Sequence, residues 1–192
     1  MSVLNQIINF KKHPVNKSID YFDDCKEKLQ KNSVLQLDDF LLPDSLQKIQ
    51  QEAMSLHSKA FYCSQKHTIL LNKKNNDLDS NDPCNIEVIS DKGCVPHDLI
   101  PPNSELISLY KSEEFIRFLE KILDVKKIYP YDDTLSSINY NYYEKNQQLG
   151  WHFDNASFAI TLMIQSPDSG GVFQYVNKGR DFEKNYIDKE LI

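Results

Sequence analysis

Residues 143–176 decide the fold and read YEKNQQLGWHFDNASFAITLMIQSPDSGGVFQYV. Residues 158–165 form an apolar run that predicts one strand, and residues 172–176 predict another after the turn at Gly170 and Gly171. Short antiparallel strands joined by turns at these spacings are typical of a small β-barrel or jelly roll. The stretch therefore predicts a barrel-like sheet with a short polar segment ahead of its first apolar strand.

That polar segment contains His152 and Asp154, which are two residues apart. On a strand, residues i and i+2 point to the same face, so an imidazole nitrogen and a carboxylate oxygen can reach one point. Two such ligands and one further histidine form the facial triad of non-haem Fe(II) oxygenases, which leaves positions open for a cosubstrate and O₂. None of the four other histidines follows His152 in the sequence.

The chain resembles the Fe(II)/2-oxoglutarate-dependent oxygenases of the prolyl-hydroxylase-like branch, which have a double-stranded β-helix (cupin-like) core. The resemblance rests on Tyr-x-x-Gly-x5-His-x-Asp, in which Asn146 stands where glycine is usual; asparagine also enters the left-handed region. It is strongest to the subgroup that acts on free amino acids, which includes hydroxylases and halogenases. The patterns Trp-His-Phe-Asp, Phe-Ala-x-Thr-Leu, Gln-x-Pro and Gly-Gly-x-Phe-x-Tyr-Val match across residues 151–176.

The resemblance implies an α+β fold with a double-stranded β-helix core, N-terminal helices packed on one sheet, and an incomplete C-terminal part. The polar, Lys- and Asn-rich composition of residues 1–33 predicts an N-terminal extension, and the resemblance implies a truncated oxygenase domain over residues 34–192. The implied cofactors are Fe(II), 2-oxoglutarate as cosubstrate and O₂, with His152 and Asp154 as iron ligands. Halogenating members typically have glycine at the carboxylate position, so Asp154 implies hydroxylation.

Four further residues are site candidates. Tyr143 aligns with a family tyrosine that either bonds a 2-oxoglutarate carboxylate or lines the pocket, although an aromatic core residue is an equal alternative. Thr161 lies on the less apolar face of the expected strand, where its hydroxyl either bonds the cosubstrate or has only a structural role. Trp151 and Asn155 flank the ligand pair and are candidates for contacting substrate or supporting the ligands.

Two family features are missing from this sequence. In the family, a later strand supplies a second histidine, and an arginine after it pairs with the far carboxylate of 2-oxoglutarate. The arginines here are Arg117 and Arg180, and Arg180 comes too early, while His97 precedes the barrel and is interpreted as a non-ligand. Three interpretations follow: a truncated hydroxylase, a barrel completed by self-association or by a second chain, or a non-catalytic remnant that binds a partner or small molecule.

Composition narrows the function classes. The net charge of −6 and the lack of a basic stripe do not favour nucleic acid as a partner. No apolar run approaches the roughly 20 residues of a membrane span, and mean hydropathy is −0.54. The four cysteines fit neither a metal knuckle nor a disulfide scaffold, so we expect reduced thiols in a cytoplasmic protein. The length predicts one domain.

Apolar periodicity and capping residues predict several further elements. The sequence predicts a helix near residues 21–31 and a strand over 34–41. A second helix is predicted to open at 43–45 with Asp44 as its cap, and a third to span 106–110. A fourth helix is predicted after the capping residue Ser112, with an apolar face formed by Phe115, Ile116, Leu119, Ile122 and Leu123. Residues 72–84 are predicted to be a polar loop.

The resemblance therefore implies hydroxylation of a C–H bond of a free amino acid or a similar small molecule. The rival is a cupin-like binding or interaction module without turnover. Fe(II)-dependent conversion of 2-oxoglutarate to succinate discriminates the two, because a binding module produces no succinate. A metal-dependent cupin isomerase is disfavoured, because such sites use several neighbouring histidines and His152 stands alone.

Overall fold

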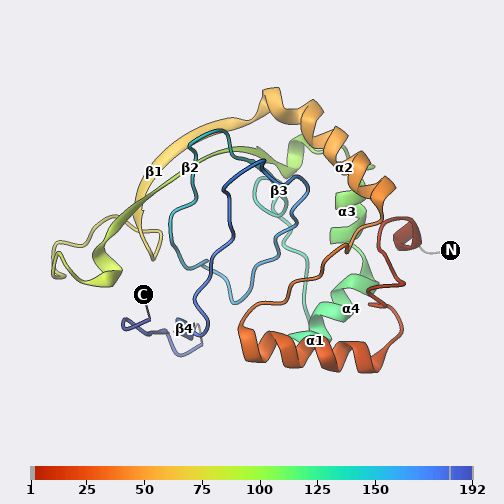
Figure 1. Ribbon diagram of the computed structural model, residues 1–192, viewed down its shortest axis with the longest axis horizontal. Helices are drawn as coiled ribbons and strands as arrows, with labels where there is room; N and C mark the ends of the chain where they lie inside the picture. The colour runs from red at the N-terminus through yellow and green to blue at the C-terminus, as the bar shows by residue number, and fades with distance from the viewer. Residues whose placement is uncertain (1–2, 182, 192) are drawn as a thin grey trace. The chain divides into compact units, whose positions relative to one another are not determined.

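A computed structural model describes residues 3–181 and 183–191 and shows a mixed α+β fold (Figure 1), which confirms the predicted class. Its strands form a three-stranded sheet of order β1-β2-β3 and a two-stranded sheet of β4 and β5, and the described residues form no closed barrel. The elements are η1 (Val3–Gln6), α1 (Ile19–Asn32), α2 (Pro43–Leu56), η2 (His57–Lys59), β1 (Phe61–Thr68), η3 (Pro83–Asn85), β2 (Glu87–Pro96), η4 (His97–Leu99), α3 (Glu105–Tyr110), α4 (Glu113–Ile122), β3 (Asn139–Tyr142), β4 (Arg180–Asp181) and β5 (Tyr186–Ile187).

The chain divides into two compact units. Unit 1 comprises Met1–Lys59 and Val95–Tyr140, and it contains all four α-helices. Unit 2 comprises Ala60–Cys94 and Asn141–Ile192, and it contains β1, most of β2, and the β4–β5 pair. The segment that holds His152 therefore belongs to unit 2.

The helices of unit 1 begin where the sequence places capping residues. Ser18 accepts a hydrogen bond from the Tyr21 N–H at the start of α1, and Ser112 does the same for Phe115 at the start of α4. These caps confirm the predicted helices. The helix after residue 42 is also present, but the prediction of Asp44 as its cap is wrong. Here Pro43 occupies the first helical turn, and Leu42 precedes it without a side-chain cap.

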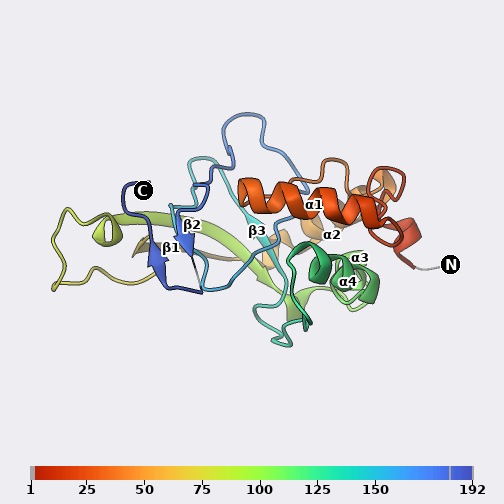
Figure 2. The ribbon, with the colours of Figure 1, turned by 90° about the horizontal axis from the view of Figure 1, so that it is seen from below.

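Phe118 is one of the largest buried side chains of unit 1 and is 1% exposed. Its ring contacts those of Tyr21 and Phe22 from α1 and stacks on Phe115 from its own helix. Helix α1 lies beside α4 in both views (Figures 1 and 2). The apolar stripe predicted for α4 omitted Phe118, yet this residue joins the two helices.

The predicted strand over residues 34–41 is wrong. Ser33 ends α1 in the left-handed conformation, and Asp39 also has a positive φ of 54° within a turn. Only Leu41 forms a β-bridge, with Ile8. The local turn chemistry outweighs the apolar alternation that suggested a strand.

Unit 2 is built on the antiparallel pairing of β1 with β2, whose register places Phe61 opposite Cys94 and Thr68 opposite Glu87. The two strands run together along most of their length (Figure 1). The predicted strands at 158–165 and 172–176 are wrong, because neither forms a ladder with any described residue. The Gly-Gly turn is confirmed, since both glycines have positive φ angles, 74° and 62°.

The loop between β1 and β2 is organised by one buried amide. Asn85 is 1% exposed, and its Nδ2 donates to the backbone carbonyls of Asn75, Leu78 and Asp79, while its Oδ1 accepts from the Asn75 N–H. A buried amide that is hydrogen-bonded to several carbonyls holds the loop in one conformation, as an apolar core would otherwise do. The polar loop predicted from the sequence is therefore a structured one.

Two further findings concern the cysteines and the helices. All four cysteines are free thiols, as the sequence predicts. Among the described residues, no helix has the length and apolar character needed to span a membrane.

Candidate functional site

The structure brings His152 and Asp154 together in unit 2. His152 Nε2 lies 3.5 Å from Asp154 Oδ1. His152 is half-buried and Asp154 is exposed, so the two side chains meet at the surface. An imidazole nitrogen and a carboxylate oxygen at this separation can coordinate one metal ion after small side-chain rotations.

The segment that carries the pair is anchored on both sides. Asp91 and Gln148 exchange two hydrogen bonds, from Asp91 N–H to Gln148 O at 2.8 Å and from Gln148 N–H to Asp91 Oδ1 at 2.6 Å. Phe153 N–H donates to Ile69 O at 2.8 Å, just beyond the end of β1. The segment therefore lies along the β1–β2 pair although it is not itself a strand.

Arg180 provides a further anchor at the first residue of β4. Its Nη1 donates to Asp154 O at 3.0 Å, and its guanidinium carbon lies 5.6 Å from the centroid of the Phe153 ring. This is cation–π distance. The arginine that the sequence analysis set aside as too early therefore places a positive charge beside the ligand pair.

A continuous hydrogen-bond chain leads from His67, near the end of β1, through Ser90 of β2 to His152. His67 Nδ1 donates to Thr68 O at 2.8 Å, because a carbonyl oxygen can only accept. In the neutral ring, His67 Nε2 then accepts from Ser90 Oγ at 2.6 Å, and Ser90 Oγ accepts from Gly150 N–H at 3.0 Å. The carbonyl oxygen of the same Gly150 accepts a hydrogen bond from His152 Nδ1 at 2.7 Å.

This chain determines which nitrogen of His152 is available. Because Nδ1 carries the proton that it donates to Gly150 O, the lone pair of the neutral ring lies on Nε2, the atom nearest Asp154. Metal-binding histidines usually donate their other ring N–H to a carbonyl or carboxylate in this way. The arrangement thus prepares the imidazole for a ligand role.

Gly150 is required for this close packing. A Cβ at this position would lie 2.7 Å from both Ile89 O and a Val88 methyl group. Any larger residue would push the segment away from β2 and separate Gly150 N–H from Ser90 Oγ. The close approach of Gly150 to Val88 and Ile89 of β2 therefore explains why a glycine precedes the ligand pair.

His67 is the functional candidate that sequence reasoning missed. Its ring meets that of His152 edge-on, with 6.2 Å between centroids. Both of its nitrogens are hydrogen-bonded, so it supports the site and is not a third ligand in this arrangement. In residues 3–181 and 183–191, no group of three or more His, Cys, Asp or Glu side chains is arranged to hold a metal ion.

The other predicted site residues lie in different surroundings. Trp151 and Asn155 flank the pair and are both exposed, and Thr161 is exposed in a segment without regular structure. Tyr143 follows β3 and keeps 47% of its surface exposed. Partial burial raises the pKa of the Tyr143 phenol, with a smaller contribution from the nearby thiol of Cys94. No hydrogen bond among the described residues joins Tyr143 or Thr161 to the ligand pair.

One local prediction close to the ligand pair is confirmed. Asn146 has a φ of 68°, which is the left-handed conformation expected where the family has glycine. The Tyr-rich run ahead of the pair forms β3. His97, interpreted as a non-ligand, belongs to unit 1, where its Nδ1 lies 2.5 Å from Ser137 Oγ.

Comparison with known proteins identifies one matching family. The family described as HalD, Halogenase D, matches residues 18–192, which is most of the chain including the ligand segment. No curated protein matches the sequence. The match is compatible with a non-haem iron enzyme of the halogenase or hydroxylase type and indicates oxidative chemistry. On this match, the chain belongs to the Halogenase D family.

Proposed function

We propose that this protein is a non-haem Fe(II)/2-oxoglutarate-dependent oxygenase that hydroxylates a C–H bond of a free amino acid or a similar small molecule. The observation that carries the proposal is the pairing of His152 and Asp154, with the His152 Nδ1 proton held by Gly150 O. The family match supports the general class, since it is compatible with a non-haem iron enzyme of the halogenase or hydroxylase type.

The donor atoms of His152 and Asp154 are of the kinds that bind Fe(II). His152 Nε2 and Asp154 Oδ1 would hold the metal, and nitrogen and carboxylate donors suit Fe(II). When bound, the iron supplies activation of O₂ together with 2-oxoglutarate. Arg180 places a positive charge near the pair and favours the approach of a dianionic cosubstrate. We propose Tyr143 and Thr161 for the cosubstrate and Trp151 and Asn155 for the substrate.

Asp154 is our reason for favouring hydroxylation over halogenation. Halogenating members of the group that the sequence resembles typically have glycine at this position, which leaves room for a halide on the metal. Here a carboxylate occupies it, 3.5 Å from the imidazole that would share the metal. A carboxylate bound at that position would compete directly with a halide.

A cupin-like binding module without turnover is the second candidate. It is favoured by one observation, namely that two and not three metal-ligating side chains meet within the described residues. A third ligand from a second copy of the chain would instead restore the triad.

The test of function is a product assay. The purified chain would be loaded with Fe(II) without air and then supplied with 2-oxoglutarate, O₂, chloride and each free amino acid in turn. We expect succinate and an amino acid that has gained oxygen, and neither with His152→Ala. A chlorinated product would contradict hydroxylation, and no succinate from a folded, iron-loaded sample would favour the binding module.

The hydrogen-bond chain leads to a prediction about Ser90. Ser90→Ala is expected to weaken Fe(II) affinity by roughly 10-fold, because the Gly150 peptide that orients His152 loses its anchor on β2. Isothermal titration without air measures the affinity. Ser90→Thr keeps the hydroxyl and is expected to restore binding, and Ser64→Ala, exposed on β1, is the matched control. Equal affinities in Ser90→Ala and Ser64→Ala would show that the chain does not orient the ligand.

A further inference from the structure

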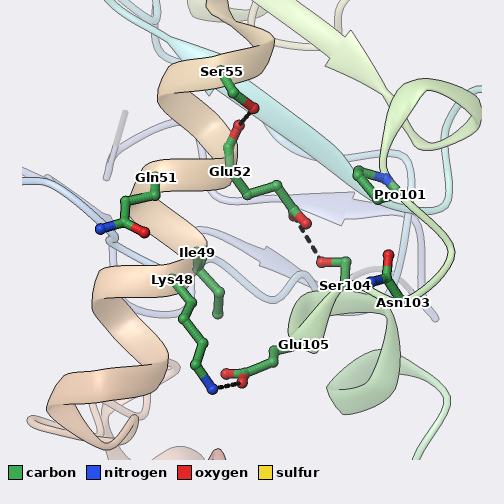
Figure 3. A pocket seen from close by; sticks show the side chains of 9 residues that line it. All are labelled: Lys48, Ile49, Gln51, Glu52, Ser55, Pro101, Asn103, Ser104 and Glu105. Carbon is green, nitrogen blue, oxygen red and sulfur yellow. Dashed lines mark hydrogen bonds and ion pairs between the residues drawn. The ribbon is translucent and has the colours of Figure 1, made fainter.

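Unit 1 contains a cavity between α2 and the beginning of α3 (Figure 3), with a volume of about 470 Å³. This is within the size range of small-molecule sites. Ile49, which is almost completely buried, and Pro101 provide apolar wall, whereas the amides of Gln51 and Asn103 are exposed at the rim. The cavity belongs to a different unit from His152, and neither the family match nor the proposed reaction assigns it a role.

One pair of charges in this cavity is already balanced. Lys48 Nζ lies 2.6 Å from Glu105 Oε1, and the buried hydroxyl of Ser45 donates to the other oxygen of Glu105. Burial opposes ionisation of Glu105, but these hydrogen bonds outweigh it and hold the pKa of Glu105 below its usual range. Lys48 and Glu105 together therefore add no net charge to the cavity.

Glu52 is a second carboxylate in the same cavity, and its charge is not balanced. Its Oε1 accepts hydrogen bonds from Ser104 Oγ at 2.7 Å and from Tyr140 OH at 2.6 Å (Figure 3 draws the first). Ser104 and Tyr140 are both buried. None of the ion pairs formed by residues 3–181 and 183–191 includes Glu52.

The two hydroxyls fix Glu52 without using its second oxygen. Both donate to Oε1, and no described residue donates a hydrogen bond to Oε2. A glutamine would satisfy the same two hydroxyls through its carbonyl oxygen, so the packing of Ser104 and Tyr140 does not require a charge. A purely structural role for Glu52 therefore explains its two hydrogen bonds but not its negative charge.

From this geometry, we propose that the cavity binds a small organic cation, a primary ammonium or a guanidinium on an aliphatic stem, with Glu52 as its counter-charge. Such a group donates hydrogen bonds to the open carboxylate oxygen, and its stem packs on Ile49 and Pro101. A hard divalent cation is a poorer fit, because it needs six or more oxygen ligands. The described residues place no third acidic or histidine ligand beside Glu52 and Glu105.

The test is an NMR titration of the full ¹⁵N-labelled chain with butylammonium and butylguanidinium chloride. Butanol and sodium butyrate serve as neutral and anionic probes of the same length. We expect saturable shifts of the amide signals of residues 51–55 and 104–106 with the two cations and not with the other probes. His152→Ala is expected to bind the cations like the wild type, so failure of the proposed function would not affect this result.

Two substitutions test the role of charge. Glu52→Gln keeps an acceptor for Ser104 and Tyr140 and is expected to weaken cation binding by roughly 10-fold or more. Lys48→Gln removes the neighbouring positive charge and is expected to tighten binding several-fold. Glu87→Gln, exposed on β2, is the charge-matched control and should behave like the wild type. Equal affinity in Glu52→Gln and the wild type, equal shifts with butanol, or no saturable shift in the cavity would each overturn the proposal.

Discussion

Replacing His152 by alanine is expected to weaken Fe(II) binding by at least about 100-fold, which corresponds to ~2.7 kcal/mol. The substitution removes one of the two donor atoms that the structure brings within 3.5 Å of each other. It leaves Asp154 as a single exposed carboxylate, and one such group holds a divalent ion weakly in water. Titration without air, followed by calorimetry, measures the change.

The control for this prediction is a histidine outside the site. His97→Ala changes unit 1 and is expected to leave Fe(II) affinity unchanged. His152→Ala should also keep the folded circular dichroism spectrum, because the Nδ1 bond of His152 goes to a carbonyl only two residues away. Equal losses of affinity in the two variants, or none in either, would show that metal binds elsewhere.

Phe118→Ala is expected to lower the free energy of unfolding by about 3–5 kcal/mol, which is the usual cost of removing a buried phenylalanine ring. The ring of Phe118 is 1% exposed and contacts aromatic rings of α1 and α4. Its loss leaves a cavity at the contact that joins the two helices. Urea unfolding followed by far-UV circular dichroism reports on these helices, which all lie in unit 1.

Phe173→Ala is the matched control for this stability prediction. Phe173 is 65% exposed, so its removal is expected to change the free energy of unfolding by less than about 0.5 kcal/mol. A large loss in Phe173→Ala, or a small one in Phe118→Ala, would contradict the assignment of the core to the α1–α4 contact.

The helices could be predicted because their signals are local. Ser18 and Ser112 cap α1 and α4 through residues three positions ahead. The left-handed Asn146 and the Gly-Gly turn likewise depend on the residues themselves. Such features follow from short-range sterics and hydrogen bonding, which the sequence displays directly.

The strands were harder to predict because a strand needs a partner. Residues 158–165 have the apolar content of a strand, yet no described segment forms a ladder with them. Conversely, β1 reads FYCSQKHT, with little apolar alternation, and still pairs with β2 along its full length. The strand is held by its ladder with β2 and by the buried His67, which is hydrogen-bonded to Ser90 of β2.

The ligand pair could be predicted from the sequence, but the hydrogen-bonded residues that orient His152 could not. His152 and Asp154 are neighbours in sequence, so their shared direction follows from the motif. Ser90 lies 60 residues before Gly150, and His67 lies 23 residues before Ser90. Only the β1–β2 register, which sets His67 and Ser90 diagonally across the ladder, brings these groups together.

The most direct test of the metal site is to locate the bound ion. ¹H–¹⁵N spectra of the chain would be recorded with small additions of Mn²⁺, a divalent ion that accepts carboxylate ligands and whose unpaired electrons broaden nearby signals. We expect the amide signals of residues 150–155 to broaden first, and this selective loss to disappear in Asp154→Ala. Broadening centred on another part of the chain, or spread evenly over its acidic surface, would contradict a metal site at His152 and Asp154.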